Sequence, residues 1–522
     1  MKNIVIIVAL ILISSLTSCK KYLQEEVYSS SETANFYINE QQGISALNGV
    51  YGGLRDTYFY YANDFTLFRM LEGPTGTVTT QPPGFMNMSY GIKDLDDIYN
   101  VWKRMWVCVN RASTLIKLLK VENIKPTSAK RILAEAKFLR ALCYFNLVRM
   151  WGDVPINNGV TTVDDAYPKK VRESVIYKLI IEDLKTASAD LPKWNEYAAY
   201  GIATSGNPLT DYQGYQAGRA TKGAAQALLA KVYLTIGSSI ASNANLYDNA
   251  FDKTEMYTKA KMMCDSVYTG THGYGLTTNY ADVFKEVNEN GKEDIFSIKF
   301  IEASDIKLGN SFAAISGLKN TGILSTEVGA LRSVPAFLTE FTVTDTRRSA
   351  TFFLDYINTN NVRVVYPTTI KQLTFKKYWS DFQIAADNTP MQRTTYVYKT
   401  TAADKARFGD DIPVLRYSDL LLMYAESLLA IGDITNSRER LADVRERAGL
   451  GRVIPAGNLL DIIIAERRRE LCFEMQLWFD YQRLNIISRY RTDLADPKFK
   501  YFPIPNSDLV MNPGLLPQNP GW

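Results

Sequence analysis

The stretch SAKRILAEAKFLRALCYFNLVRMW, residues 128–151, carries apolar residues at three- and four-residue spacing along its whole length. That spacing places the apolar side chains along one side of an α-helix, which repeats about every 3.6 residues. Trp151 and Gly152, with Pro155 shortly after, indicate where the helix ends. The stretch therefore predicts one long amphipathic helix.

A short pattern inside this helix recurs twice downstream: a small residue, then two large ones three and four positions later. The three copies are Ala141-x-x-Tyr144-Phe145, Ala230-x-x-Tyr233-Leu234 and Ala425-x-x-Leu428-Leu429. The last two continue to Gly237 and Gly432, which we expect to end their helices. Small residues that admit a partner helix are typical of tetratricopeptide-type hairpins. Chance similarity among amphipathic helices explains the pattern equally well, and the irregular spacing argues against a plain solenoid.

Helical periodicity also fills much of the remaining chain, but two stretches interrupt it. Residues 195–218 are rich in Gly, Tyr and small polar residues, and residues 272–412 mix turns with short β-branched and aromatic runs such as FTVTDTRRS and NVRVVYPTTI. The proline-rich ending, residues 501–522, predicts little regular structure. We therefore predict a mainly α-helical fold, a tetratricopeptide-like scaffold carrying an irregular layer of loops and short strands, in one body over residues 19–522.

The N-terminus reads as a secretory signal over residues 1–18, with a lysine, an apolar run from Ile4 to Leu16 and small residues after it. The apolar run is too short to span a bilayer comfortably. Leu16-Thr17-Ser18-Cys19 resembles the bacterial lipobox, which predicts that Cys19 carries a lipid and becomes the mature N-terminus. Several acyl chains together anchor a protein firmly. A plain signal peptide with an incidental cysteine is the alternative.

Composition indicates an ordinary globular protein. The chain has 522 residues, 46% of them hydrophobic and 22% charged, with a net charge of +4. Because the charges are mixed and form no basic block, nucleic-acid binding is not expected. The remaining cysteines lie in helix-like apolar patterns, so we expect buried small side chains in preference to a disulfide framework, although an exported protein can pair two of them; they are Cys108, Cys143, Cys264 and Cys472.

Motifs for catalysis and for metal or cofactor binding are missing from the sequence. The single histidine, His272, stands in what reads as an exposed loop, where a bystander is more common than a general base. The segment from Glu286 resembles a calcium loop but has Ser297 where a bidentate glutamate is required. Asp94, Asp96 and Asp97 fit the first turn of a helix. A pair of hydrolytic carboxylates stays open as the enzymatic alternative, because their spacing is three-dimensional.

A charged run, Glu466-Arg467-Arg468-Arg469-Glu470, interrupts an otherwise apolar helical pattern near the C-terminus. Acid and base stand three and four positions apart, which is the spacing of ion pairs along one helix face. We expect this run to tie its helix to neighbouring elements, and not to form an anion site.

Six segments, in order, resemble the SusD/RagB family of outer-membrane nutrient-binding lipoproteins of Bacteroidetes. They are SCKKYLQEEV with ISALNGVYGGL, AEAKFLRALCYFNLVRMWGDVPI, GRATKGAAQALLAKVYL, PVLRYSDLLLMYAESLL with RLADVRERAGL, IIAERRRELCFEMQLWFDYQRL, and FPIPNSDLVMNPGLLPQNPGW. One departure is visible: the family's usual Gly-x-Arg-Trp is replaced by Met475-Gln476-Leu477-Trp478. This puts in doubt any ion pair of the missing arginine, but not the fold.

The resemblance implies four tetratricopeptide-like helical pairs with a less regular ligand-facing layer. It implies a lipid-anchored protein of the outer membrane, facing the cell surface. It also implies a partner, a TonB-dependent transporter of the SusC type, over whose mouth the protein sits as a lid. The family's role is to capture glycans, or sometimes peptides, and to deliver them without cleaving them, with no cofactor and no metal.

Sugar binding needs aromatic rings for the apolar face of a pyranose and planar polar groups for its hydroxyls, held on loops of a rigid scaffold. Three loop-rich segments provide them, the first in a region from which family members commonly draw contacts. For any single ring, packing beneath a loop is the alternative. The candidate ligand-binding residues are Arg69, Glu72, Phe85, Asn87 and Tyr90; Tyr274 and Tyr280; and Trp379 and Phe382.

The sequence therefore predicts a non-catalytic surface protein that binds an oligosaccharide and hands it to a transporter. Two other classes stay open. One is a tetratricopeptide-like interaction scaffold without a ligand of its own, and the other is a surface glycoside hydrolase. The residues themselves do not show whether the ligand is a glycan or a peptide.

Overall fold

A computed structural model describes residues 36–59, 66–80, 96–159, 167–193, 218–285, 288–300, 312, 316, 331–357, 363–368, 373–378 and 410–522. The expected signal segment, Cys19 and nearly all of the stretch 195–218 lie outside these described residues.

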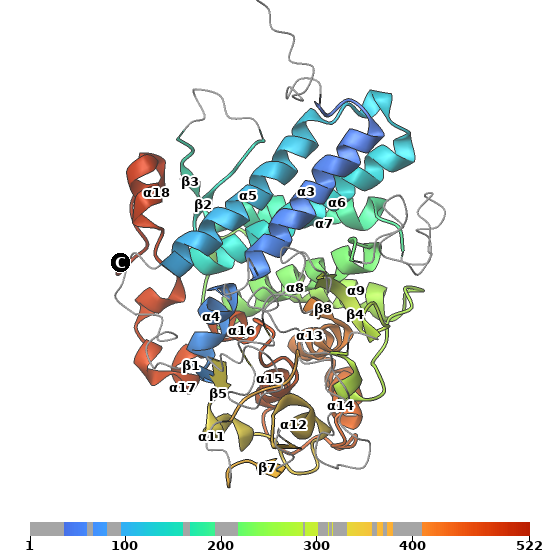
Figure 1. Cartoon of the computed structure of the whole chain (residues 1–522), viewed down its shortest axis with the longest axis vertical. Coiled ribbons are helices and arrows are strands. Elements are labelled where there is room, and N and C mark those ends of the chain that lie inside the picture. The colour runs from blue at the N-terminus through green and yellow to red at the C-terminus, as the bar shows by residue number, and fades with distance from the viewer. Residues whose placement is uncertain are drawn as a thin grey trace, which may run out of the picture.

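Long helices make up most of the described structure, so the prediction of a mainly helical fold is confirmed (Figure 1). Helices that follow one another in sequence pack side by side, as α5 does on α6, α6 on α7, α8 on α9 and α13 on α14. The long helices are α3 (Glu40–Phe59), α5 (Asp96–Leu118), α6 (Pro126–Trp151), α7 (Glu173–Asp190), α8 (Lys222–Ala241), α9 (Lys253–Tyr268), α13 (Tyr417–Ala430), α14 (Ile434–Arg447) and α15 (Leu459–Glu470).

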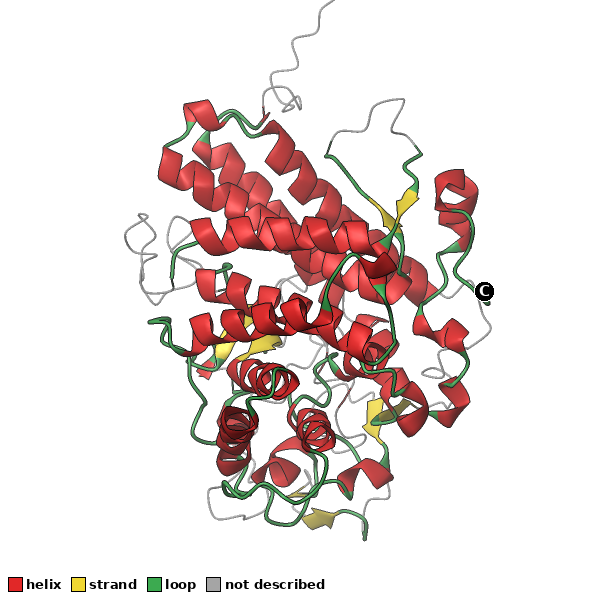
Figure 2. Ribbon diagram, turned by 180° about the vertical axis from the view of Figure 1, so that it is seen from behind, coloured by secondary structure: helices red, strands yellow, loops and turns green. Residues whose placement is uncertain are grey.

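Shorter elements fill the irregular layer and the C-terminal region. The short helices are α4 (Thr66–Glu72), α11 (Pro335–Leu338), α12 (Thr346–Thr351), α16 (Leu477–Arg483), α17 (Ile487–Tyr490) and α18 (Asn506–Met511). The strands form antiparallel pairs, which Figure 2 shows as short arrows among the helices. The pairs are β1 (Val78–Thr80) with β5 (Leu331–Ser333), β2 (Val154–Pro155) with β3 (Lys170–Val171), β4 (Asp294–Ile298) with β8 (Ile412–Arg416), and β6 (Asp355–Ile357) with β7 (Arg363–Val365).

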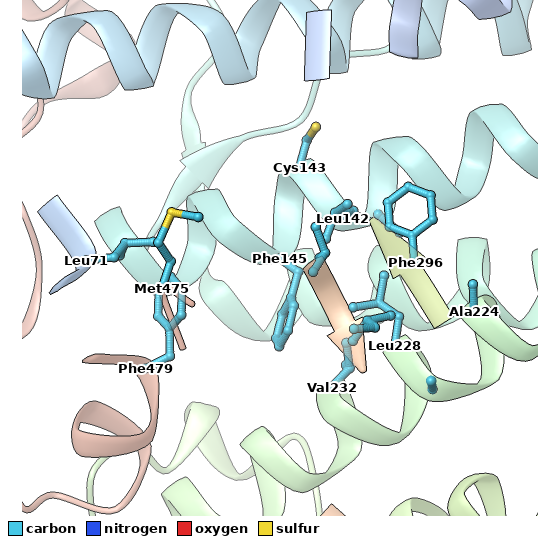
Figure 3. Packing of buried hydrophobic residues seen from close by; sticks show 14 of the residues in the cluster. Leu71, Leu142, Cys143, Phe145, Ala224, Leu228, Val232, Phe296, Met475 and Phe479 are labelled. Carbon is cyan, nitrogen blue, oxygen red and sulfur yellow. The ribbon is translucent and has the colours of Figure 1, made fainter. Parts of the chain in front are cut away.

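The core is centred on α6, α8 and the β4–β8 pair (Figure 3). Phe145 of α6, Leu228 of α8 and Phe296 of β4 are each buried to 3% exposure or less. Burial of one such side chain stabilises the fold by about 1.5–3 kcal/mol. Among the described helices, α8 alone is long and apolar enough to cross a membrane, but 83% of its apolar window is buried inside the protein.

The small residues of the recurring pattern lie where helices meet. Ala141, Ala230 and Ala425 are completely buried. Gly432, in the left-handed region with φ of +89°, follows the end of α13 as predicted. The prediction for Gly237 is wrong, because α8 continues to Ala241. A Cβ atom at Gly237 would lie 3.3 Å from Met256 Cβ, so this glycine admits α9 and does not end α8.

The cysteines of the described residues, Cys108, Cys143, Cys264 and Cys472, are buried and form no disulfide, as expected.

The C-terminal segment folds back on the helices and is more regular than its prolines predicted. It contains the short helix α18, whose Asp508 accepts a hydrogen bond from Trp102 of α5 at 3.0 Å. The indole of Trp151, the last residue of α6, donates to the Pro503 carbonyl at 3.0 Å. Asn519 donates to the Trp151 carbonyl at 2.9 Å. These bonds anchor the chain end to the scaffold.

The charged run of α15 ties the helix to other elements, which confirms the prediction. Glu470 is completely buried and pairs with Arg347 and Arg416, each at 3.1 Å, and with Arg447. Glu466 pairs with Arg347 at 2.6 Å. Burial alone would raise the pKa of Glu470, but the surrounding cations hold it well below its usual value.

The middle arginines of the run extend the same network. Arg467 pairs with Asp419 of α13 at 2.9 Å and with Asp480 of α16 at 2.8 Å. Arg468 pairs with Glu340, after α11, at 2.8 Å. One helix turn therefore holds α13, α16 and the irregular layer together.

Replacing Glu470 by Gln leaves buried arginines without their shared counter-charge. We expect the free energy of unfolding to fall by roughly 3–5 kcal/mol, measured by urea denaturation. The matched control is Glu439→Gln, at a half-exposed pair with Arg452, where we expect a change of about 0.5 kcal/mol or less. Equal effects of the two substitutions would contradict the dominant role of the buried network.

Candidate ligand-binding site

A hollow of about 170 Å³ lies where the start of α8, the loop after α9 and strand β4 meet. Its lining includes Thr221, His272, Tyr274, Asn290 and Asp294. The lining residues come from separate parts of the sequence. One predicted ligand-binding residue, Tyr274, lies in the wall of the hollow. The hollow is therefore the candidate site among the described residues.

The aromatic wall of the hollow is built on the first turn of α8. Thr221 caps this helix by accepting a hydrogen bond from the Ala224 amide at 3.0 Å, and its hydroxyl is 2.9 Å from that of Tyr274. A Cβ atom at Gly223 would lie 2.5 Å from the Tyr274 ring, so only glycine lets the ring lie on the helix. Burial raises the pKa of Tyr274 to about 12.

His272 is 5% exposed, so the prediction of an exposed loop histidine is wrong. Its ring stacks on Tyr274, with 5.9 Å between the centroids and 17° between the planes. The loop after α9 turns inward, which buries His272 and half-buries Tyr274, because the two rings pack on the small residues Gly223 and Gly270.

The floor of the hollow is a chain of charged groups. Asp294 accepts hydrogen bonds from Lys299 at 3.0 Å and from the Ser297 hydroxyl at 2.6 Å. Lys299 also pairs with Asp411 at 2.6 Å. The segment that resembled a calcium loop thus ends in an ion pair, and no group of three or more carboxylate, histidine or cysteine side chains in the described residues could hold a metal ion.

Glu289 and Asp411 lie beside this floor as a carboxyl pair. Glu289 accepts a hydrogen bond from the Asp411 amide at 2.8 Å, which brings the two side chains together. Burial, followed by the charge of Asp411, raises the pKa of Glu289 to about 10. Glu289 and Asp411 lie closer together than the two carboxyl groups of a glycosidase, which stand about 5 Å or more apart.

Arg219 lines the hollow but is occupied elsewhere. Its guanidinium donates to Glu135 at 3.0 Å and to Asn48 at 2.8 Å, which fixes the chain before α8 to α6 and α3. Asn290 and Lys292, at the rim, have exposed polar side chains.

The other predicted binding residues are dispersed. Arg69 of α4 pairs with Asp97, in the first turn of α5. Glu72 is completely buried, accepts a hydrogen bond from the Met475 amide at 2.6 Å, and has its pKa raised to about 8 by burial. A direct ligand contact by Glu72 is therefore corrected: its carboxyl group supports the turn before α16.

Tyr280 is also in the core, at 2% exposure. Its hydroxyl donates to the Glu470 carbonyl at 3.2 Å, and the Lys377 amine lies 5.5 Å from its ring centroid. This ring packs under the loop, which was the alternative stated for it, so the expected ligand contact of Tyr280 is corrected as well. The predictions for Phe85, Asn87, Tyr90, Trp379 and Phe382 fall outside the described residues.

The departure at Met475–Trp478 is accommodated by apolar packing. Leu477, at the position of the family's arginine, is 1% exposed. Met475, at the position of the family's glycine, has φ of +60°, in the left-handed region that favours glycine. Its side chain lies beside Leu71 and Phe479 (Figure 3). Gln476 accepts a hydrogen bond from the buried Lys231 at 2.6 Å.

The mainly helical fold is shared with known proteins. The family model "SusD family" matches residues 240–498, and the model "Starch-binding associating with outer membrane" matches residues 21–234. The chain belongs to the SusD/RagB family.

Relatives and solved structures agree over nearly the whole chain. The SusD-like protein P2 of Formosa agariphila is 26% identical, over 98% of both chains. A SusD-like protein of Bacteroides ovatus is 25% identical, over 80% of this chain and 70% of the relative. Among solved structures, a laminarin-binding SusD-like protein has a TM-score of 0.72 at 23% identity, covering 93% of this chain and 100% of that one. A structure with a xylogluco-oligosaccharide has a TM-score of 0.69 at 20% identity, covering 90% and 98%.

Glu72 makes stability depend on pH. Its pKa is about 8 in the folded chain against an ordinary value of 4.5, so the unfolded chain releases the proton first as pH rises. The stability that the neutral group contributes is therefore lost between about pH 4.5 and 8. We expect Glu72→Gln, which keeps a neutral acceptor, to be more stable than the native chain at pH 9, by on the order of 4 kcal/mol, and nearly equal at pH 5.

Urea denaturation at both pH values measures this difference. Glu446→Gln, at an exposed pair with Arg452, is the matched control and should show almost no pH-dependent difference. If the stability difference between Glu72→Gln and the native chain were equal at pH 5 and pH 9, the raised pKa of Glu72 would be contradicted.

Proposed function

We propose that this protein is a cell-surface lipoprotein that binds a nutrient oligosaccharide without cleaving it and delivers it to a SusC-type TonB-dependent transporter. The observation that carries the proposal is membership of the SusD/RagB family, together with a laminarin-binding structural neighbour that aligns over 93% of this chain. A second neighbour was solved with a xylogluco-oligosaccharide.

The geometry of the hollow supports a partial contact with a larger ligand. Its volume of about 170 Å³ is below the roughly 300–1,000 Å³ of pockets that enclose a drug-sized molecule. Gly218, Gly273 and Gly291 line it, and glycine lets backbone approach a ligand closely. Asn290 and Lys292 supply an amide and an amine at the rim for sugar hydroxyls. We infer that the hollow takes one end or one unit of an oligosaccharide.

Aromatic stacking supplies the remaining affinity in this proposal. Tyr274 is held on both sides, by His272 and by α8, so its ring contributes an edge to the wall and not a free face. The free faces are proposed for Phe85, Tyr90, Trp379 and Phe382, with Asn87 and Arg69 as polar partners, as the sequence pattern predicts.

Delivery of the ligand depends on the lipid anchor and on the transporter that receives the ligand. Cys19 is proposed to hold the protein on the outer membrane through its lipid, facing the cell surface. A binding protein placed over the mouth of a transporter raises the local concentration of its ligand, so that modest affinity suffices.

A binding screen of the lipid-free chain, from Lys20 onward, tests the proposal. We expect at least one poly- or oligosaccharide of a broad panel that includes laminarin and xyloglucan to bind saturably, to raise the melting temperature, and to be recovered uncleaved. Recovery of shortened products would establish a hydrolase. Failure of the whole panel to bind or to shift the melting temperature would point to peptides or to a scaffold role.

The hollow itself is tested by the double substitution Asn290→Gly and Lys292→Ala. Glycine is chosen because Asn290 has φ of +59°, which alanine would strain. We expect about tenfold weaker binding of the glycan found in the screen, equal to about 1.4 kcal/mol, by titration calorimetry. Lys178→Ala, on the exposed side of α7, is the control. Unchanged affinity in the double variant would place the ligand elsewhere.

A further inference from the structure

The start of the described chain and the connection between α5 and α6 lie together at one end of the helical bundle (Figure 1). The Lys120 amide, in this connection, donates a hydrogen bond to the Tyr37 carbonyl at 2.8 Å. A Cβ atom at Gly43 of α3 would lie 2.9 Å from Leu119 Cδ1, so α3 packs closely on the same connection. The chain that leads from the expected anchor at Cys19 therefore joins the body at this end.

This end of the bundle, residues 36–43 and 117–130, has a basic surface, and we name it the anchor end. It contains four lysines and two glutamates. Glu122 is exposed and Glu40 is half-buried. The four lysines are all exposed to solvent; they are Lys117, Lys120, Lys125 and Lys130.

Two of these lysines stand where the helix itself disfavours them. Lys125 precedes α6 and Lys130 lies in its second turn, at the end of the helix where the dipole favours negative charge. The first turn of α6 contains no acidic residue, and the side chain of Lys125 makes no capping hydrogen bond. The stability of α6 therefore gains nothing from these charges, which fit a negatively charged partner outside the chain.

Apolar and aromatic side chains accompany the lysines. Ile38 and Val121 are 38% and 43% exposed. Phe36 and Tyr37 are half-buried, with their rings in edge contact at 5.1 Å between the centroids. Lysines beside exposed aliphatic and aromatic side chains are typical of protein surfaces that lie on a membrane.

The position of the expected anchor also favours a membrane as the partner. Phe36 follows Cys19 by seventeen positions, which span at most about 60 Å when fully extended. The anchor end can rest on the membrane at any extension of this segment. Any other face would require the segment to run along the body, which costs more of its conformational freedom.

We propose that the anchor end rests on the membrane that holds the lipid, with its four lysines against phosphate-bearing headgroups and with Ile38 and Val121 at the level of those headgroups. The inference rests on the lipid anchor of the proposed function and adds a second contact to it. Each lysine near an anionic membrane surface adds to the attraction. The lipid holds the protein at the membrane, and the anchor end fixes which face of the body turns toward it.

Sedimentation with vesicles tests the proposal, and the lipid-free chain from Lys20 onward is used so that the lipid does not dominate binding. Phosphatidylcholine vesicles are compared with vesicles that contain roughly one third phosphatidylglycerol, whose headgroup is an anionic phosphate. We expect binding to the anionic vesicles to be about tenfold stronger at low salt. That preference should disappear at about 0.5 M salt, because salt screens exposed charges. Equal binding to both kinds of vesicle, or none to either, would overturn the proposal.

Two triple variants of equal net charge locate the contact. We expect the anchor-end variant to bind the anionic vesicles about tenfold more weakly than the native chain, and the control variant to bind them as the native chain does. An equal loss in both variants would show that overall charge drives binding, which would contradict a defined contact face. The anchor-end variant is Lys117→Gln, Lys120→Gln and Lys125→Gln, and the control, at exposed lysines elsewhere, is Lys169→Gln, Lys178→Gln and Lys253→Gln.

A fluorescent label shows which face meets the membrane in the lipidated, full-length protein. Val121→Cys carries an environment-sensitive dye, and the cysteines of the described residues are buried and do not compete for it. We expect the emission at position 121 to shift to shorter wavelength on anionic vesicles. The control is Val343→Cys, at a side chain that is 89% exposed, where we expect no shift. A shift at position 343 and none at position 121 would place another face on the membrane.

The outcomes are separable from those of the proposed function. None of the four lysines lines the hollow, so the anchor-end variant should bind the glycan found in the screen as the native chain does. Glycan binding without vesicle binding overturns the membrane contact alone and assigns the anchor end to a protein partner. Absence of acylation at Cys19 by mass spectrometry overturns the anchor and this inference with it, and leaves glycan capture standing.

Discussion

The counter-charge around Glu470 is the constraint on which the rest of the structure depends. Glu470 sits in the core with Arg347, Arg416 and Arg447, which come from the irregular layer, the end of β8 and α14. Each of these charges would be costly to bury alone, and the energy recovered depends on all partners being present together. The network therefore makes the helical half and the irregular half of the chain one cooperative unit.

That linkage explains why the candidate site lies where it does. The hollow opens at the junction of α8, a rigid core helix, and β4, whose neighbour Glu293 pairs with Arg416 at 2.6 Å. Loops that leave a rigid framework can present side chains to a ligand at low conformational cost.

Buried charges in the described residues are balanced in two ways. The buried arginines and lysines are paired with carboxylates, as Arg347, Arg416 and Arg467 are. Glu72 and Glu289 show the opposite solution, because burial raises the pKa of each and favours a neutral, hydrogen-bonded carboxyl group.

The helices, their small-residue contacts and the structural role of the charged run of α15 were readable from the sequence. Such features depend on residues three or four positions apart, and helical geometry alone brings those together. The irregular layer was recognised only in outline: NVRVVYPTTI contains β7, whereas FTVTDTRRS forms a turn and α12, capped by Asp345. The local pattern there carried no information on strand partners.

The candidate site shows the same division between what the sequence determines and what the tertiary structure decides. The sequence by itself determined that Tyr274 belongs to a glycine-rich loop, and tertiary structure decided that His272 and α8 hold its ring. Glu72 and Tyr280 have the composition of ligand contacts, yet they lie in the core, because Met475 and Glu470 approach them from the far end of the chain. Whether a polar side chain faces a ligand or the interior depends on partners hundreds of residues away, and only the folded chain brings those partners together.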